Sequence, residues 1–139
     1  FMPNKSEQKI NHGLNGHYTS WAHALALMGN LFGNKNMIDL SWNQIYRSFG
    51  LNDFGVSFIS GVGYNNPMPH SRFLGTSIGG FMIGFIGNTD DNSYVDLKAK
   101  AQWNSTEYWN TPIGNCCMAL AELLPKEILP ESKLGKRLF

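Results

Sequence analysis

Glu107 stands among aromatic residues, in a setting that suits acid catalysis. Trp103 precedes it, and Tyr108 and Trp109 follow it, in the stretch "QWNSTEYWN". Apolar neighbours favour the uncharged form of a carboxyl group, so such a glutamate can hold a proton until it donates it. The alternative is a structural glutamate near the positive end of a helix dipole. We take Glu107 as a candidate general acid.

A second group of candidates follows an irregular stretch, "SGVGYNNPMPHSRF". Its glycines and prolines predict a loop, and loops often carry binding residues. His70 and Arg72 are two residues apart, so an extended backbone places both side chains on one face. Both can donate hydrogen bonds to sugar hydroxyls, and Arg72 can also orient a carboxylate. The alternative for Arg72 is a structural role, binding loop carbonyls.

The composition suits an uncharged ligand that is rich in hydroxyl groups. Charged residues make up 15% of the chain and the net charge is +1, which gives no electrostatic case for nucleic acid or an anionic membrane. Aromatic residues make up 13%, and no apolar run approaches the ~18 residues of a membrane helix. The candidates for stacking on a sugar ring are Tyr64, Phe73, Tyr94, Trp103, Tyr108 and Trp109, with core packing as the alternative for each.

The other histidines and the cysteines carry weaker signals. His12, His17 and His23 show no recognisable metal-site spacing, and His23 is expected in a core or groove. Cys116 and Cys117 are helix neighbours that point about 100° apart, so we expect two small buried hydrophobes rather than a disulfide. We expect no cofactor, although a structural calcium ion could stiffen the loops.

Apolar periodicity predicts three helices and a long irregular region. The first helix is expected from a cap at Thr19 or Ser20 to Gly33, the second after a short turn to Gly50, and the third over 113–124 before Pro125. Between them we expect a packed loop with short extended pieces at 57–60 and 81–86. The first helix is apolar on more faces than one partner helix can cover. The chain is therefore expected to be part of a larger helical domain.

Residues 40–121 resemble the C-terminal part of the catalytic domain of glycoside hydrolase family 9, the inverting cellulases. The stretch "WNQIYRSFGLNDFGVSFISGVGYNNPMPHSRF" has the order of the family's first signature. In that signature a helix ends in a Gly-x-Asn turn, and a Ser/Thr-rich strand, a Gly-x-Gly, an Asn-Pro loop and a His-x-Arg follow. Ser71 departs from the family, which carries a second histidine there.

The second family signature holds an aspartate, an aromatic residue and the catalytic glutamate, just before the last barrel helix. The stretch "DDNSYVDLKAKAQWNSTEYWNTPIGNCCMALAEL" has these parts with altered spacing. One alignment places Glu107 at the acid position, and we prefer it because it keeps a carboxylate. A second alignment places Asn104 there and predicts an inactive or divergent enzyme. The family aspartate could match Asp90, Asp91 or Asp96.

The resemblance implies an all-α fold, a portion of an (α/α)6 barrel with long irregular active-site loops. Residues 1–139 would be the C-terminal segment of one catalytic domain, in a secreted, periplasmic or cell-surface protein. The reaction would be hydrolysis of a β-linked glucan or gluco-oligosaccharide with inversion, which needs two carboxyl groups ~6.5–9.5 Å apart. Glu107 would be the acid, and the base would come from the remaining part of the domain, outside this chain.

Two alternatives stay open at the level of sequence. One is another (α/α)6 carbohydrate-active enzyme, such as a polysaccharide lyase with a tyrosine or histidine base. The other is a non-catalytic carbohydrate-binding or scaffold protein, which the alignment on Asn104 would suit. A glycosylation sequon, "NST", begins at Asn104, and we expect it to be unused because a glycan there would obstruct the cleft.

Overall fold

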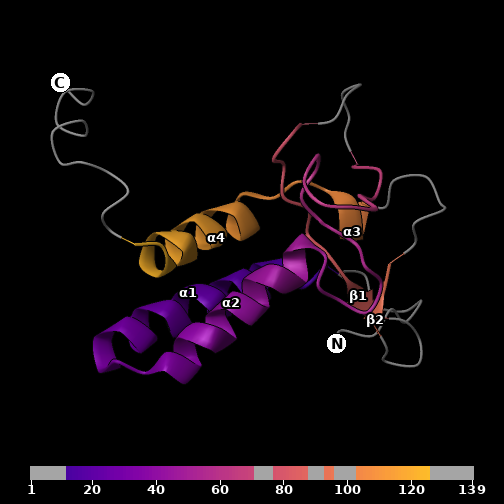
Figure 1. Cartoon of the computed structure of the whole chain (residues 1–139). Coiled ribbons are helices and arrows are strands. Elements are labelled where there is room, and N and C mark those ends of the chain that lie inside the picture. Colours follow the sequence, from indigo (N-terminus) through magenta and orange to yellow (C-terminus); the bar gives the residue numbers. More distant parts are fainter. Residues whose placement is uncertain (1–11, 71–76, 88–92, 96–102, 126–139) are drawn as a thin grey trace, which may run out of the picture.

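The computed structural model describes residues 12–70, 77–87, 93–95 and 103–125, and most of these residues are helical (Figure 1). The helices are α1 (Asn15–Phe32), α2 (Lys35–Phe49), α3 (Trp103–Thr106) and α4 (Asn110–Leu123). Two short strands, β1 (Ile86–Gly87) and β2 (Ser93–Tyr94), pair with each other in antiparallel orientation. The mostly helical character agrees with the predicted all-α class.

A tight turn joins α1 and α2 into an antiparallel hairpin. Gly33 ends α1 in the left-handed conformation (φ 61°), and the Asn34 N–H donates to the carbonyl oxygen of Gly29 (2.8 Å). The Asn34 side chain then accepts from the Met37 N–H (3.3 Å) and caps α2. Gly29 is required by close packing, because a Cβ there would lie 2.7 Å from Cδ1 of Ile38. These contacts confirm the predicted short turn.

The helix α4 runs parallel to α1. Near their N-terminal ends the Asn115 side chain donates to the Gly16 carbonyl oxygen (3.5 Å), and near their C-terminal ends Asn30 donates to the Glu122 carbonyl oxygen (2.8 Å). The core between the three long helices and the neighbouring loops contains Ala22, Ile45, Ile59, Phe81, Cys116 and Ala119. The parallel arrangement brings the N-terminal ends of two helices together, at the side where the helices meet the loops (Figure 1).

Two predicted helix starts are wrong by several residues. The helix α1 begins at Asn15 rather than after a cap at Thr19, whose hydroxyl instead donates to the Asn15 carbonyl oxygen inside the helix (2.8 Å). Distant carbonyl groups do the capping, because the N–H groups of Leu14 and Asn15 donate to loop residues. The helix α4 begins at Asn110 rather than at residue 113, so Pro112 lies in its first turn. Proline has no backbone N–H, and this costs nothing there because the first N–H groups of a helix have no partner within it.

Residues 56–60, 80–85 and 105–109 form a compact structure that we call the loop layer. The segment 80–85 is hydrogen-bonded to each of the other two. The Met82 N–H donates to the Phe58 carbonyl oxygen (2.9 Å), and the Ile83 N–H donates to the Glu107 carbonyl oxygen (3.0 Å). The layer encloses its own apolar cluster of Val56, Phe58, Met82, Phe85 and Val95, with Tyr108 packed against it. The packed loop is thus as predicted, but residues 57–60 form only an isolated bridge, between Ile59 and Phe81.

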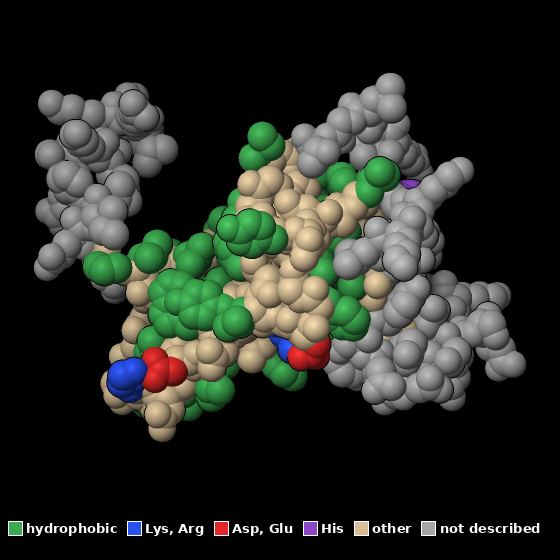
Figure 2. Space-filling model, turned by 45° about the vertical axis from the view of Figure 1, so that its right-hand side comes forward, with side chains coloured by type: hydrophobic (Ala, Val, Ile, Leu, Met, Phe, Trp, Pro, Cys, Tyr) green, Lys and Arg blue, Asp and Glu red, His purple; other side chains and the backbone are tan. Residues whose placement is uncertain are grey.

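One side of α1 is apolar and exposed. The residues on its inner side, Ala22, Ala26 and Gly29, are buried against the other helices. The exposed large apolar side chains of α1 are Trp21, Leu27, Met28, Leu31 and Phe32, with exposed fractions from 43% to 74%. Hydrophobic side chains also cover much of the face in Figure 2, where charged side chains are few. Within the described ranges, α1 therefore presents apolar surface that no element covers, as its pattern predicted.

Candidate functional site

The structure brings the predicted acid and the end of the predicted binding loop together. The segments of His70 and Glu107 form a parallel bridge, in which the His70 N–H donates to the carbonyl oxygen of Thr106 (3.0 Å). Both His70 and Glu107 are half-buried. The glycine- and proline-rich loop therefore ends beside the glutamate.

The Glu107 carboxylate is held by an aromatic neighbour. The indole Nε1–H of Trp109 donates to Oε2 of Glu107 over 2.8 Å, in a partly buried setting. The two residues lie on one extended connection between α3 and α4, and residues i and i+2 of an extended chain point to the same side. This hydrogen bond gives the carboxylate a defined direction beside the indole.

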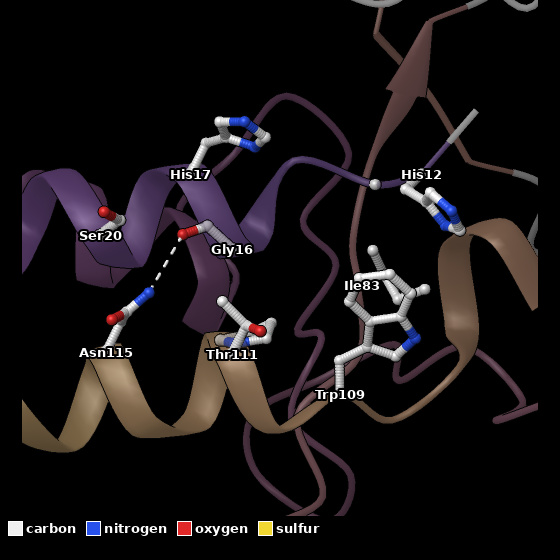
Figure 3. Close-up of a pocket in the computed structure, with 10 residues that line it drawn as sticks. His12, Gly16, His17, Ser20, Ile83, Trp109, Thr111 and Asn115 are labelled. Atoms are coloured by element: carbon white, nitrogen blue, oxygen red, sulfur yellow. Dashed lines mark hydrogen bonds between the residues drawn. The ribbon is translucent and has the colours of Figure 1, made fainter. Parts of the chain in front are cut away.

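Trp109 also forms a wall of a pocket between the N-terminal ends of α1 and α4 (Figure 3). The pocket has a volume of about 430 Å³. Its lining residues are His12, Gly13, Gly16, His17, Ser20, Ile83, Trp109, Thr111, Pro112 and Asn115. A pocket of this size, with an aromatic wall and a few polar groups, is typical of a small-molecule site.

The polar side chains of the pocket come from both helices. His17 and Ser20 extend from α1, and Thr111 and Asn115 from α4, on opposite sides of the space in Figure 3. The His12 ring lies against the Trp109 ring, with centroids 4.8 Å apart and planes inclined by 48°. Among the described residues, the lining holds hydroxyl, amide and imidazole groups and no carboxylate, lysine or arginine. It can therefore exchange hydrogen bonds with a neutral hydroxylated ligand.

Tyr108 and Tyr64 lie outside this pocket lining. The Tyr108 hydroxyl shares a 2.6 Å hydrogen bond with the Ser60 hydroxyl, and its ring packs so close to Gly80 that a Cβ there would lie 2.5 Å from the ring. These contacts give Tyr108 a packing role in the loop layer. Tyr64 is 86% exposed on the loop. Sugar contact by either tyrosine stays a prediction.

The other predicted residues lie outside the described part of the chain, in β2 or in α3. Arg72, Phe73, Asp90, Asp91 and Asp96 lie outside the described residues. Trp103 is the first residue of α3, and its role in stacking stays a prediction. Asn104, the rival acid position, follows in α3, and its carbonyl oxygen accepts from the N–H of Gly13 (2.9 Å), a pocket residue. Neither Glu107 nor Asn104 belongs to the pocket lining itself.

Sequence reasoning missed most of the pocket. His12 and His17 carried only a weak signal near a helix start, and Ser20 was taken as a cap. Thr111 and Asn115 had no functional signal, because the pocket exists only where two helices distant in sequence come together. Sequence reasoning also missed Asn66, outside the pocket. Its amide donates to the carbonyl oxygens of Ser57, Ile59 and Val62 (3.1, 2.8 and 3.0 Å).

Comparisons with protein-family models, with curated proteins and with solved structures find no match for this chain. In the described part of the chain, no group of three or more His, Cys, Asp or Glu residues could hold a metal ion. No helix of that part is long and apolar enough to cross a membrane. The family and the reaction therefore stay predictions from the motifs and the geometry.

Proposed function

We propose that this chain supplies the acid side of a site that hydrolyses β-linked glucans or gluco-oligosaccharides with inversion. Glu107 protonates the leaving oxygen, and the pocket beside Trp109 holds a sugar unit next to the scissile bond. The base comes from a part of the catalytic domain outside this chain. His70, whose segment lies beside that of Glu107, contacts the sugar, and the same role is proposed for Arg72, which is outside the described residues.

The hydrogen bond between Trp109 and Glu107 carries this proposal. It joins a carboxyl group to the aromatic wall of a pocket whose polar groups are all neutral or imidazole. A glycosidase needs both elements, a carboxylic acid at the glycosidic oxygen and a platform for the sugar ring. The bridge between His70 and Glu107 adds the end of the predicted binding loop to the same place.

The exposed face of α1 supports the proposal that this chain belongs to an (α/α)6 barrel. Exposed apolar patches of this kind mark surfaces that pack against protein. The parallel pair of α1 and α4, with the antiparallel α2 outside, is the arrangement that neighbouring helical pairs of such a barrel would have. Further helical pairs would cover α1 and bring the base to the pocket.

The test uses azide in place of the missing base and its water. Azide attacks the anomeric carbon as the glycosidic bond breaks, and the leaving oxygen takes its proton from Glu107. We expect the chain to convert cello-oligosaccharides into an α-glycosyl azide, detected by mass spectrometry and NMR. Glu107→Gln should lower the rate by about 10²–10⁴-fold, because a positioned acid contributes that much.

Glu122→Gln is the matched control. Glu122 accepts a hydrogen bond from Asn30 at the other end of α4, and its change should leave the rate as it was. Full activity of Glu107→Gln in the azide assay would contradict the proposal, because another group would then protonate the leaving oxygen. A lyase would form no glycosyl azide, and it would instead release an unsaturated product, which absorbs in the ultraviolet, from a polysaccharide that contains uronate.

A second candidate function is carbohydrate binding without catalysis. The observation that favours it is the place of Glu107, which borders the pocket only through the indole and is not one of its described lining residues. Under this function the chain binds oligosaccharide, but it forms neither glycosyl azide nor reducing sugar at any azide concentration. Binding by calorimetry beside the azide assay distinguishes the two functions.

A further inference from the structure

Trp109 touches both halves of the proposed site, and this double contact suggests a role beyond stacking. Its ring forms a wall of the pocket, while its Nε1–H donates to the carboxylate of Glu107. We propose that Trp109 is a positioning residue that couples occupation of the pocket to the orientation of the Glu107 carboxyl group. This inference rests on the proposed function, because it concerns the same acid and the same sugar.

The main chain holds Trp109 and Glu107 in a fixed relation. The Trp109 N–H donates to the Phe81 carbonyl oxygen (3.1 Å), and the Glu107 carbonyl oxygen accepts from the Ile83 N–H (3.0 Å). Both anchors belong to the same segment of the loop layer, and α4 begins directly after Trp109. The backbones are thus tied, and the indole–carboxylate bond is what sets the side chains relative to each other.

The bond also makes the two carboxyl oxygens of Glu107 unequal. An indole N–H is a donor only, so Oε2 of Glu107 acts as its acceptor. The carbonyl-type oxygen of a carboxylic acid is the better acceptor, so this bond favours the acidic proton on Oε1. A sugar that stacks on the indole holds the indole in place. The indole in turn holds Oε2 through the hydrogen bond, so Oε1 keeps its direction toward the glycosidic oxygen.

The ring has a second neighbour that limits its motion. The His12 ring packs against Trp109 at 4.8 Å, on the pocket side shown in Figure 3. The indole therefore has one partner at its Nε1–H and another beside its ring. Loss of the carboxylate would remove one of these two restraints and leave the pocket wall less well ordered for the ligand.

A double-mutant cycle on oligosaccharide binding tests the coupling. Glu107→Ala removes the acceptor, and Trp109→Phe removes the N–H donor but keeps a ring. Cellotetraose binding to the chain is measured by calorimetry for the parent, both single variants and the double variant. We expect Glu107→Ala to weaken binding about fivefold to tenfold in the parent, as loss of one hydrogen bond predicts. In the Trp109→Phe background the same change should have no effect.

Glu107→Gln separates the hydrogen bond from the charge. Its amide oxygen can still accept from the indole, so binding should return to within about twofold of the parent. Trp42→Phe, on an indole that stacks on Tyr46 in α2, is the control and should not change the cycle.

The outcomes separate this inference from the proposed function. If Glu107→Ala weakens binding equally with Trp109 and with Trp109→Phe, Glu107 contacts the sugar directly and the coupling is wrong, while the proposed site stands. If the parent chain binds no oligosaccharide, the proposed function fails. In that case the hydrogen bond is tested without sugar, by the fluorescence emission of the indole. Glu107→Ala should shift the emission when Trp109 is present but not in the Trp109→Phe background. An unchanged emission overturns the inference.

Discussion

The three long helices and the loop layer are held together in different ways. In the helices, main-chain hydrogen bonds are local, and burial of small and branched residues joins the elements. In the loop layer, main-chain bonds connect segments that are distant in sequence, and asparagine side chains satisfy carbonyl groups that no strand partner reaches. The candidate site lies at the junction, where the loop layer meets the N-terminal ends of α1 and α4. A rigid site therefore requires the loop layer to be as well packed as the helices.

The largest expected effect compares one core residue from each region. Phe58 and Ile45 are both almost completely buried, the first in the loop layer and the second in α2. Phe58→Ala and Ile45→Ala should each lower the free energy of unfolding by about 3–4 kcal/mol, because each leaves a cavity. Urea unfolding followed by circular dichroism measures both. A loss below about 1 kcal/mol for Phe58→Ala alone would show that the loop layer is not a packed core.

The next effect tests the asparagine that organises the loop. Asn66→Ala removes the donor to three carbonyl oxygens and should lower the free energy of unfolding by about 2 kcal/mol. Asn43→Ala, at an exposed position of α2, is the matched control and should change it by less than about 0.5 kcal/mol. Equal effects of the two changes would contradict the role of Asn66.

A smaller effect is expected at the start of α2. Asn34→Ala removes the side-chain cap and should lower the free energy of unfolding by about 1 kcal/mol. Asn36→Ala, two residues further on at an exposed position, should have little effect. Thermal unfolding monitored by circular dichroism measures both, and a neutral Asn34→Ala would mean that tertiary contacts alone position α2.

The last effect on stability concerns the two cysteines of α4, and it is absent at neutral pH. Burial, and to a lesser degree the neighbouring Cys117, raises the pKa of Cys116 from 9.0 to about 11. The folded protein therefore keeps the Cys116 proton where the unfolded chain loses it, so stability should fall as the pH rises from 9 to 11. Cys116→Ala should remove this dependence in unfolding measurements made at each pH. The predicted burial is right for Cys116 and wrong for Cys117, which is exposed, so at neutral pH a thiol reagent should modify Cys117 much faster than Cys116.

The amino-acid pattern alone was enough to predict the three long helices, although not the starts of α1 and α4. Apolar periodicity and terminal glycines predicted α1, α2 and α4, because helical bonds and caps are local and each residue type acts within a turn or two. The Asn-Pro loop and the aromatic residues around Glu107 predicted a sugar site, which stays a prediction, and the structure shows that the segments of His70 and Glu107 lie side by side. The pattern also predicted that α1 would have more apolar surface than its neighbours cover.

Only the tertiary structure decided where α1 begins, which aromatic side chains face a pocket, and that a pocket exists. The N–H groups at the start of α1 are capped by carbonyl groups of the loop layer, which local sequence cannot reveal. Tyr108 and Trp109 are adjacent and alike in type, yet one packs on Gly80 and the other lines the pocket. The reason is geometric: neighbours in an extended segment point to opposite sides, and the sides acquire their identity only when distant segments pack against them.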